Sequence, residues 1–269
     1  MPLSEAQAGI LRLLAAHRDP ESYVAGSTPL NWDAPRLSAD VDVFHDREER
    51  VAQAALNDSA ILAASGFCLE WLRREPGLYA VLATGPLGAT RLEWALDSDF
   101  RFFPTMPDPL FGYVLHPADL AANKAMAAAG RREPRDVVDL LTIHDRVLPL
   151  GAVIWSAVGK SLGFTPEGLI GEIRRLAHYT VADFARVASE PPVDPTLTML
   201  RLRTVLDEAE AFVVQMPTDR VGLLFLEDGK PVQPDPSLLE AYQTHAGQRR
   251  GSWPSSPGLT ASMLDKHIR

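Results

Sequence analysis

The chain has 269 residues, of which 46% are hydrophobic and 23% are charged, and its formal net charge is −9 at pH 7. These proportions are ordinary for a globular protein that buries a sizeable core. The negative charge excludes a protein coated in basic surface for nucleic acid, while leaving room for a local basic groove. A single cysteine, Cys68, excludes an intrachain disulfide and fits a reducing cytosol.

The N-terminal residues MPLSEAQAGILRLLAAHRD lack the charged start and the continuous apolar run of a signal peptide. They predict an amphipathic helix instead, with Ile10, Leu11, Leu13 and Leu14 on its inward side. The longest apolar stretch, VLPLGAVIWSAVGKSLGF, contains a proline and a lysine and is too broken to span a membrane. We therefore expect a cytoplasmic protein with no membrane partner.

The next segments combine strand and helix patterns. The predicted strands are SYVAG, SADVDVF, LYAVLAT and TRLEWALDS, and the last two flank the Gly- and Pro-containing turn of a hairpin. Between the first two strands, STPLNW predicts a short helix or turn with Ser27 as its N-cap and Pro29 in its first turn. REERVAQAALNDSAILAASG predicts a helix that ends at Gly66.

From residue 117 onward, helix patterns dominate. PADLAANKAMAAAG predicts a helix opened by Pro117, and EPRDVVDLLTIHDR predicts another with Pro134 near its start. Further helical segments follow up to Gln215. RVGLLFLEDGKPVQP then predicts a small hairpin with Asp228 and Gly229 at its turn, and the Gly-, Ser- and Pro-rich end predicts a mobile tail.

This order of elements predicts an α+β fold, in which a small mixed β-sheet flanked by helices is followed by a mostly helical C-terminal region. We expect an α/β domain over residues 1–120, a mainly helical domain with a small hairpin over 121–235, and a flexible tail over 236–269. The sequence contains no internal repeat.

Two acids interrupt the apolar pattern of the strand DVDVF. Because successive strand side chains alternate between faces, Asp40 and Asp42 point the same way, while Val41 and Val43 point toward the core. Two neighbouring carboxylates repel each other unless a cation lies between them, and Mg2+ takes one or two carboxylates together with water and phosphate oxygens. The pair predicts a metal site, although Asp-x-Asp is also common on exposed strand edges.

The Gly26-Ser27 pair stands shortly before these acids. Glycine accepts unusual backbone dihedrals and allows a ligand to approach closely. The amides that follow it, with the Ser27 hydroxyl, predict an anion site. Phosphates held there would lie next to a metal held by Asp40 and Asp42. Gly-Ser alone is a frequent loop dipeptide, but the order and spacing of the two motifs favour a nucleotide site.

GSTPLNWDAPRLSADVDVF resembles the signature of the DNA polymerase β-like nucleotidyltransferase superfamily, in which a strand ending in Gly-Ser precedes a strand with two metal-binding acids. More narrowly, the chain resembles the AbiEii/AbiGii toxin-type nucleotidyltransferases. In that family, a Lys-bearing helix precedes a short basic stretch and an Arg-Asp-x-x-Asp-Leu helix. HPADLAANKAMAAAGRREPRDVVDLL matches this with Lys124, Arg135, Asp136 and Asp139. The resemblance covers roughly residues 20–145.

The resemblance implies a polymerase β-like fold and roles for these residues. Lys124 lies among alanines, which leave room for a ligand, and its ammonium could reach a triphosphate; the alternative is a solvated surface lysine. Arg135 would help to bind the nucleotide. Asp136 and Asp139 share one helix face and could orient Lys124 or Arg135, or contact the base or ribose. For Asp136 the alternative is an acid favoured by the helix dipole.

The superfamily generally uses a third carboxylate from a neighbouring strand, which helps hold a second metal and takes the proton from the acceptor hydroxyl. In RLEWALDSDF, Glu93 and Asp97 alternate with apolar residues, so both are expected to leave the core on one face. Glu93 is the candidate, where the superfamily commonly has an aspartate. A single-metal arrangement therefore remains an alternative to two metals.

The function predicted from these motifs is a nucleotidyltransferase that uses Mg2+, with Mn2+ as an alternative, and moves a nucleoside monophosphate from an NTP to an acceptor hydroxyl. The resemblance implies a toxin of a toxin–antitoxin or phage-defence system, with tRNA as the acceptor and a separate antitoxin protein as a partner. The arginines at 131, 132, 135, 174 and 175 form a basic patch that could attract RNA, or a solvated helix face.

Two alternatives remain open. One is a small-molecule nucleotidyltransferase of the antibiotic-modifying kind, which the acidic net charge favours slightly. The other is a catalytically inactive module that binds a nucleotide or a partner. The sequence lacks a Gly-x-x-x-x-Gly-Lys-Ser/Thr loop and a Gly-x-Ser-x-Gly elbow, so a P-loop enzyme and a serine hydrolase are not expected.

Overall fold

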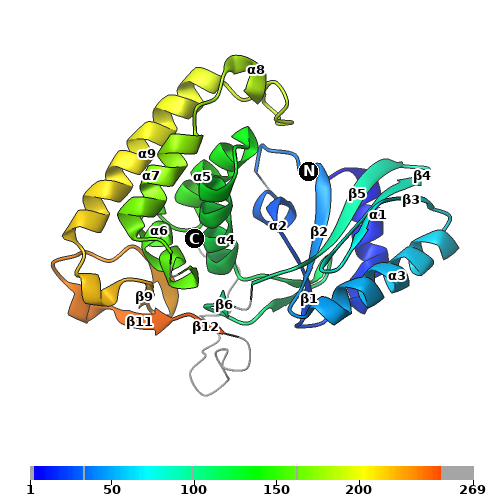
Figure 1. Cartoon of the computed structure of the whole chain (residues 1–269), viewed down its shortest axis with the longest axis horizontal. Helices are drawn as coiled ribbons and strands as arrows, with labels where there is room; N and C mark the ends of the chain where they lie inside the picture. The colour runs from blue at the N-terminus through cyan, green and yellow to red at the C-terminus, as the bar shows by residue number, and fades with distance from the viewer. Residues whose placement is uncertain (1–2, 33, 99, 162, 250–269) are drawn as a thin grey trace. The chain divides into compact units, whose positions relative to one another are not determined.

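The chain divides into two units, one built on a seven-stranded sheet and one that is mostly helical (Figure 1). The computed structural model describes residues 3–32, 34–98, 100–161 and 163–249. The first unit comprises Met1–Asp99 and Thr105–Leu115, and the second comprises Phe100–Pro104 and His116–Arg269. The predicted α+β class, with a mixed sheet flanked by helices and a helical C-terminal region, is confirmed.

The sheet of the first unit has the strand order β3-β4-β5-β2-β1-β8-β7. Its pairing is mixed, because β2 runs parallel to β5 and β1 runs parallel to β8, while the other neighbours are antiparallel. The strands are β1 (Ser22–Ala25), β2 (Asp40–His45), β3 (Cys68–Glu75), β4 (Leu78–Gly85), β5 (Gly88–Leu96), β7 (Met106–Asp108) and β8 (Gly112–Val114).

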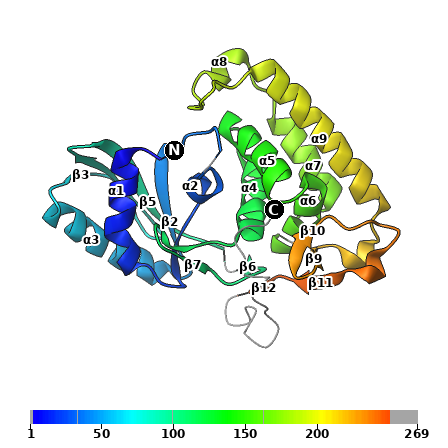
Figure 2. The same cartoon turned by 180° about the vertical axis from the view of Figure 1, so that it is seen from behind.

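Helices α1 (Glu5–Leu14) and α3 (Glu48–Ala64) pack on one face of this sheet (Figures 1 and 2). The core joins apolar residues of both helices to alternate residues of the strands, including Val41, Val43 and Trp94. Of the residues predicted on the inward side of α1, Ile10, Leu11 and Leu14 are buried, whereas Leu13 is 39% exposed. A helix contacts a sheet over about 100° of its surface, and Leu13 lies outside that arc.

Strand β3 was not predicted, although β4 and β5 form the predicted hairpin. A bulge between Trp71 and Arg73 interrupts the pairing of β3 with β4. One extra residue reverses the alternation of side chains beyond it, so Leu72 is half exposed and the period-two pattern is lost. As an edge strand, β3 also carries exposed charges that leave little hydrophobic signal.

The second unit surrounds two helices made almost entirely of small or apolar residues. Helix α4 (Pro117–Gly130) has the predicted bounds, and all eight residues of α6 (Leu150–Ala157) are buried. The other helices are α5 (Pro134–Arg146), α7 (Pro166–Leu176), α8 (Val181–Phe184) and α9 (Pro195–Gln215). The remaining regular elements are β6 (Phe100–Arg101), β9 (Leu223–Glu227), β10 (Lys230–Val232), β11 (Gln243–Ala246), β12 (Gln248–Arg249) and the 3-10 helices Ala15–His17, Val158–Lys160, Thr218–Arg220 and Leu239–Ala241.

The predicted hairpin of this unit is present as β9 and β10. Asp228 and Gly229, at its turn, have φ of 50° and 79°. Both values lie in the left-handed region that a two-residue type I′ turn requires. The predicted mobile tail falls largely on residues 250–269, which lie outside the described residues. Among the residues described, no helix is long and apolar enough to cross a membrane.

A buried carboxylate anchors the segment Phe100–Pro104 to the second unit. Asp119 of α4 accepts hydrogen bonds from the backbone nitrogens of Phe102, at 2.7 Å, and Phe103, at 3.0 Å. The ring of Phe103 also stacks against His245 of β11, with 4.8 Å between centroids. Burial raises the pKa of Asp119 to about 6, even though the two backbone hydrogen bonds oppose this shift.

Replacing this carboxyl group will change how stability depends on pH. Because the pKa of Asp119 is raised from 3.8 to about 6, its contribution to stability is present below about pH 4 and is lost as the pH rises through 6. We compare the unfolding free energy of the wild type with that of Asp119→Asn. Across that pH interval, we expect the wild type to lose on the order of 2 to 3 kcal/mol relative to the variant. Urea titrations at several pH values measure it.

Asp235→Asn serves as the control for this series. Hydrogen bonds from the side chain and backbone of Ser237 lower the pKa of Asp235, so its trend with pH should have the opposite sign. A difference for Asp119→Asn that does not change with pH would contradict the raised pKa.

Candidate functional site

Gly26 and Asp42 are in direct contact in the first unit. Gly26 follows β1 with φ of 71° and ψ of −142°, and it is the N-cap of α2 (Ser27–Leu30). A Cβ placed on Gly26 would lie 2.2 Å from Asp42 Oδ2. Only a glycine therefore allows the turn and this carboxylate to lie so close together. Ser27 was predicted as the N-cap, but it is the first residue of the helix.

Asp40, Asp42 and Glu93 lie on one face of the sheet. Residues 40, 42 and 44 of β2 are half-buried, and the residues between them are buried under the helices. In the parallel pairing of β2 with β5, Asp42 is opposite Glu93 and Asp40 is opposite Arg91. Because paired residues on neighbouring strands share a face, these four charged side chains form a two-by-two group.

Within this group, Glu93 is ion-paired with Arg91. Arg91 Nη2 lies 2.5 Å from Glu93 Oε2, and the two side chains are 42% and 27% exposed. Asp97, the other acid considered from the sequence, lies beyond the end of β5. Its carboxylate accepts a hydrogen bond from the Tyr23 hydroxyl at 2.7 Å. Glu93 is thus the acid of β5 that is paired in register with the Asp-x-Asp strand.

Hydroxyl groups tie the start of α2 to the start of β2. The Ser27 and Ser38 hydroxyl oxygens are 3.0 Å apart. Thr28 and Ser38 donate hydrogen bonds to the Asp40 carbonyl at 2.8 and 2.9 Å. These contacts hold the Gly26-Ser27 turn beside the strand that carries the acids. No motif in the sequence points to Thr28 or Ser38. Their only sequence signal is that they are small hydroxyl residues flanking the two motifs.

In the second unit, Lys124 of α4 forms a buried ion pair with Asp139 of α5. The Lys124 Nζ–Asp139 Oδ2 distance is 2.7 Å, and the side chains are 9% and 0% exposed. This burial excludes the alternative that Lys124 is a solvated surface lysine. The alanines around Lys124 take part in helix packing. They are buried where α4 packs against α5, α6 and α7, because small side chains let helices approach closely.

Asp136 of α5 is bound by Arg131 rather than by Lys124 or Arg135. Arg131 Nε and Nη2 donate to its two carboxylate oxygens at 2.7 and 2.9 Å, which is a bidentate pair. Arg135 lies near Glu133, with 3.7 Å between Nε and Oε2. The structure thus groups Gly26, Ser27, Asp40, Asp42 and Glu93 in the first unit, and Lys124, Arg135, Asp136 and Asp139 in the second.

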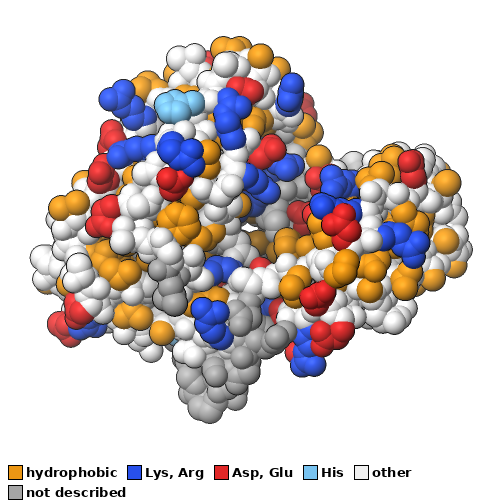
Figure 3. Space-filling model, viewed as in Figure 1, with side chains coloured by type: hydrophobic (Ala, Val, Ile, Leu, Met, Phe, Trp, Pro, Cys, Tyr) orange, Lys and Arg blue, Asp and Glu red, His pale blue; other side chains and the backbone are white. Residues whose placement is uncertain are grey.

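The arginines of the predicted basic patch each have an acidic partner. Charges of both signs also alternate on the face of the molecule shown in Figure 3. Paired arginines attract a polyanion less than free ones, because each new phosphate contact must displace a carboxylate. The pairs are Arg131–Asp136, Arg132–Asp183, Arg135–Glu133, Arg174–Asp207 and Arg175–Glu172.

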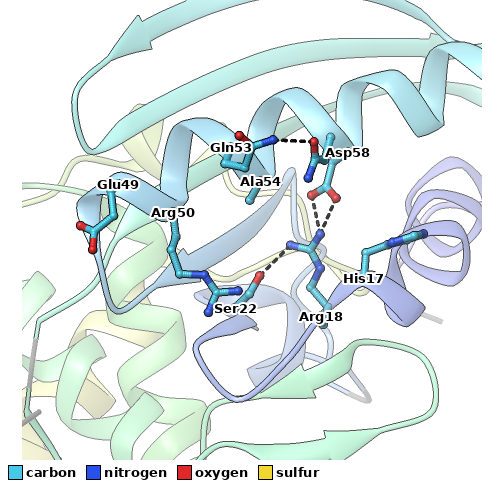
Figure 4. A pocket seen from close by; sticks show the side chains of 9 residues that line it. His17, Arg18, Ser22, Glu49, Arg50, Gln53, Ala54 and Asp58 are labelled. Carbon is cyan, nitrogen blue, oxygen red and sulfur yellow. Dashed lines mark hydrogen bonds and ion pairs between the residues drawn. The ribbon is translucent and has the colours of Figure 1, made fainter. Parts of the chain in front are cut away.

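A polar cavity of about 420 Å³ lies in the first unit between α3 and the segment that follows α1 (Figure 4). Arg18 and Asp58 meet in its wall with 2.5 Å between Nη2 and Oδ1, and Asp58 also accepts from Trp94 Nε1 at 2.7 Å. Burial, with the nearby charges of Arg18 and Arg50, lowers the pKa of His45 to about 3. No sequence pattern predicts this cavity, because its residues come from separate elements.

No family model and no curated protein matches the sequence. Among solved structures, the chain is similar to JHP933 from Helicobacter pylori, with 14% identity and a TM-score of 0.47 over 79% of this chain and 95% of that one. It is similar to an antigenic nucleotidyltransferase-like protein from Paracoccidioides brasiliensis, with 14% identity and a TM-score of 0.38 over 68% and 99% of the two chains. It is also similar to the MgGTP-bound Cid1 poly(U) polymerase, with 16% identity and a TM-score of 0.27 over 54% of this chain and 44% of that one. At these identities and TM-scores, a function must rest on the chain's own residues.

Gly26→Ala will destabilise the protein more than Gly66→Ala. Both glycines have positive φ, 71° and 87°, so both substitutions strain the backbone by about 1 to 2 kcal/mol. A new Cβ at position 66 would meet nothing within 4 Å, whereas at position 26 it would overlap Asp42. We expect an additional loss of about 1 to 3 kcal/mol for Gly26→Ala in urea unfolding. Equal losses would show that Asp42 is not held against the turn.

Lys124→Met will leave the Asp139 carboxylate buried without its cation. Breaking a buried pair in this way costs about 3 to 5 kcal/mol, whereas removing both charges is often close to neutral. We therefore expect the double variant Lys124→Met/Asp139→Leu to recover most of the unfolding free energy lost in the single variant. Chemical denaturation of the two variants and the wild type measures this coupling, and additive losses would contradict it.

Proposed function

We propose that this protein is a metal-dependent nucleotidyltransferase that moves a nucleoside monophosphate from an NTP to an acceptor hydroxyl and releases pyrophosphate. The observation that supports it most is the packing of the Asp42 carboxylate against the Gly26-Ser27 turn, with Asp40 on the same face. A phosphate-binding turn beside two carboxylates is the arrangement that a metal–triphosphate complex needs.

The carboxylates fit a magnesium ion by their chemistry. Mg2+ is a hard cation that accepts one or two carboxylates and completes its octahedron with water and phosphate oxygens. Asp40 and Asp42 would hold it, with Mn2+ as an alternative. Within the described residues, no three His, Cys, Asp or Glu side chains are placed to hold one ion. When bound, the ion would neutralise phosphate charge.

The chain's own residues have distinct roles in this proposal. The Gly26-Ser27 turn binds phosphate oxygens through backbone amides and the Ser27 hydroxyl. Glu93, opposite Asp42, accepts the proton of the attacking hydroxyl. The second unit is assigned separately: by resemblance, Lys124 and Arg135 bind nucleotide, and Asp139 holds the Lys124 ammonium in a fixed position. Asp136 is proposed to keep Arg131 in place in the same way.

Two classes of acceptor molecule are proposed. The resemblance to AbiEii/AbiGii toxins suggests a cytoplasmic toxin that modifies tRNA and has an antitoxin partner. The carboxylate partners of the basic patch instead favour a second candidate, a small-molecule acceptor of the antibiotic type, because little unpaired positive charge faces a polyanion. A module that binds nucleotide without transfer is a third outcome of the test below.

Asp42→Asn will abolish pyrophosphate release, because the amide cannot replace a charged metal ligand; we expect a loss of at least a hundredfold. Release is measured from each of the four ribonucleoside triphosphates with Mg2+, alone, with total tRNA and with aminoglycosides. Glu70→Gln is the matched control, because Glu70 is an exposed acid of the same sheet. Nucleotide binding without release under every condition would leave the binding module, and unchanged release in Asp42→Asn would disprove the mechanism.

A further inference from the structure

The polar cavity of the first unit lies apart from the residues assigned to nucleotidyl transfer (Figure 4). Because β1 and β2 are antiparallel, Ser22, which lines the cavity, is at the opposite end of this strand pair from Asp42. It is also on the face of the sheet that the helices cover. The volume of about 420 Å³ is in the range of sites for small organic molecules rather than for single ions.

Arg18 places a fixed guanidinium in the cavity wall, where its side chain is only 2% exposed. It donates to the Leu14 carbonyl at 3.4 Å, to Ser22 Oγ at 3.1 Å and to both carboxylate oxygens of Asp58 at 2.5 Å. A guanidinium has five N–H groups, so within the described part of the chain one N–H group of Nη1 remains to donate. Asp58 also accepts from Trp94 Nε1, so both of its oxygens are engaged.

Arg50 of α3 is fixed in a similar way. Its Nη1 atom donates to Asp19 Oδ1 at 3.2 Å and to Glu21 Oε2 at 3.0 Å, and its Nη2 atom donates to Asp19 Oδ2 at 2.5 Å. Its Nε–H group has no acceptor among the residues that the structure describes. A ligand could therefore accept hydrogen bonds from both arginines without displacing a carboxylate.

His45 adds a buried ring with unpaired nitrogens beside this wall. It is opposite Ser22 in the β1–β2 pairing, so the two side chains share a face of the sheet. The ring is fully buried, and neither of its nitrogens has a hydrogen-bond partner within the described residues. Because an unpaired buried polar group is unfavourable, a ligand that reaches one of these nitrogens is bound more tightly.

The electrostatic potential around His45 favours an anion. Burial lowers the pKa of this ring to about 3, and the charges of Arg18 and Arg50 lower it further than the charge of Asp19 raises it. The surrounding charges are thus net positive, and the neutral imidazole has one N–H group to donate. Fixed donors in a positive potential suit an oxyanion, which offers several acceptor atoms.

We propose that this cavity binds the phosphate group of a small molecule, through the remaining N–H groups of Arg18 and Arg50 and a ring nitrogen of His45. The site is independent of the proposed nucleotidyl transfer, because it shares no residue with the Gly26-Ser27 turn or the acids of β2. Glu49, an exposed acid that also lines the cavity, weakens binding by repelling the anion.

Phosphorus NMR titrations with inorganic phosphate and with glycerol phosphate test this site in the absence of NTP. We expect the wild type to bind the phosphate group and Arg50→Gln to bind it about tenfold more weakly, because a charge-assisted hydrogen bond is lost. Tighter binding of glycerol phosphate would identify a phosphate monoester as the ligand. Equal or weaker binding would identify the free ion.

His45→Leu separates binding from folding. The substitution keeps about the volume of the ring and removes both nitrogens. Since these have no partner within the described residues, the unfolding free energy in phosphate-free buffer should not fall. We expect phosphate binding to be about tenfold weaker in this variant.

Glu49→Gln and Glu48→Gln form a matched pair. Removing the charge of Glu49 should tighten phosphate binding, because a like charge no longer repels the anion. Glu48 precedes it on α3 and is also exposed, but it does not line the cavity. Its substitution should leave the affinity unchanged.

Three results would overturn the proposal. The first is no binding of either probe by the wild type, and the second is unchanged affinity in both Arg50→Gln and His45→Leu. The third is binding that Ser27→Ala abolishes and Arg50→Gln retains, which would place the phosphate at the Gly26-Ser27 turn instead. None of these results depends on whether the protein transfers a nucleotide.

Discussion

The packing of the Asp42 carboxylate against Gly26 is the constraint on which the rest of the candidate site depends. It joins the end of β1 to the middle of β2, and no residue with a side chain fits at position 26 without displacing the acid. The same turn begins α2, and hydroxyl groups then secure that helix to the Asp40 carbonyl. One backbone conformation therefore sets the position of the anion-binding turn relative to the acids.

These acids lie on the face of the sheet opposite the one that α1 and α3 cover. Strand alternation then separates two kinds of residue: Val41 and Val43 enter the core, and Asp40 and Asp42 do not. The parallel pairing of β2 with β5 adds Glu93 and Arg91 to the same face. A one-residue shift in that register would place the acids of β2 opposite Leu92 and Trp94, which belong to the core.

Some of the charges that this protein buries are held in ion pairs. Arg18 is paired with Asp58 beneath the sheet, and Lys124 with Asp139 between two helices, and each pair is almost inaccessible to solvent. Such pairs contribute little net stability, but they specify which helix faces meet, because an unpaired buried charge is strongly unfavourable. Asp119 is a different case, because backbone amides bind its carboxylate in place of a cation.

The sequence alone determined the fold class and most elements, because their signals are local: alternation in DVDVF, proline and glycine at the ends of α4, and Asp-Gly at the β9–β10 turn. It also singled out the acids and the Gly-Ser turn. Only the tertiary structure decided which charges meet. That Arg91 binds Glu93, Arg131 binds Asp136, and Lys124 is buried against Asp139 depends on strand register and helix packing. Strand β3 escaped prediction for the related reason that a bulge and an exposed edge remove the periodicity through which a sequence indicates a strand.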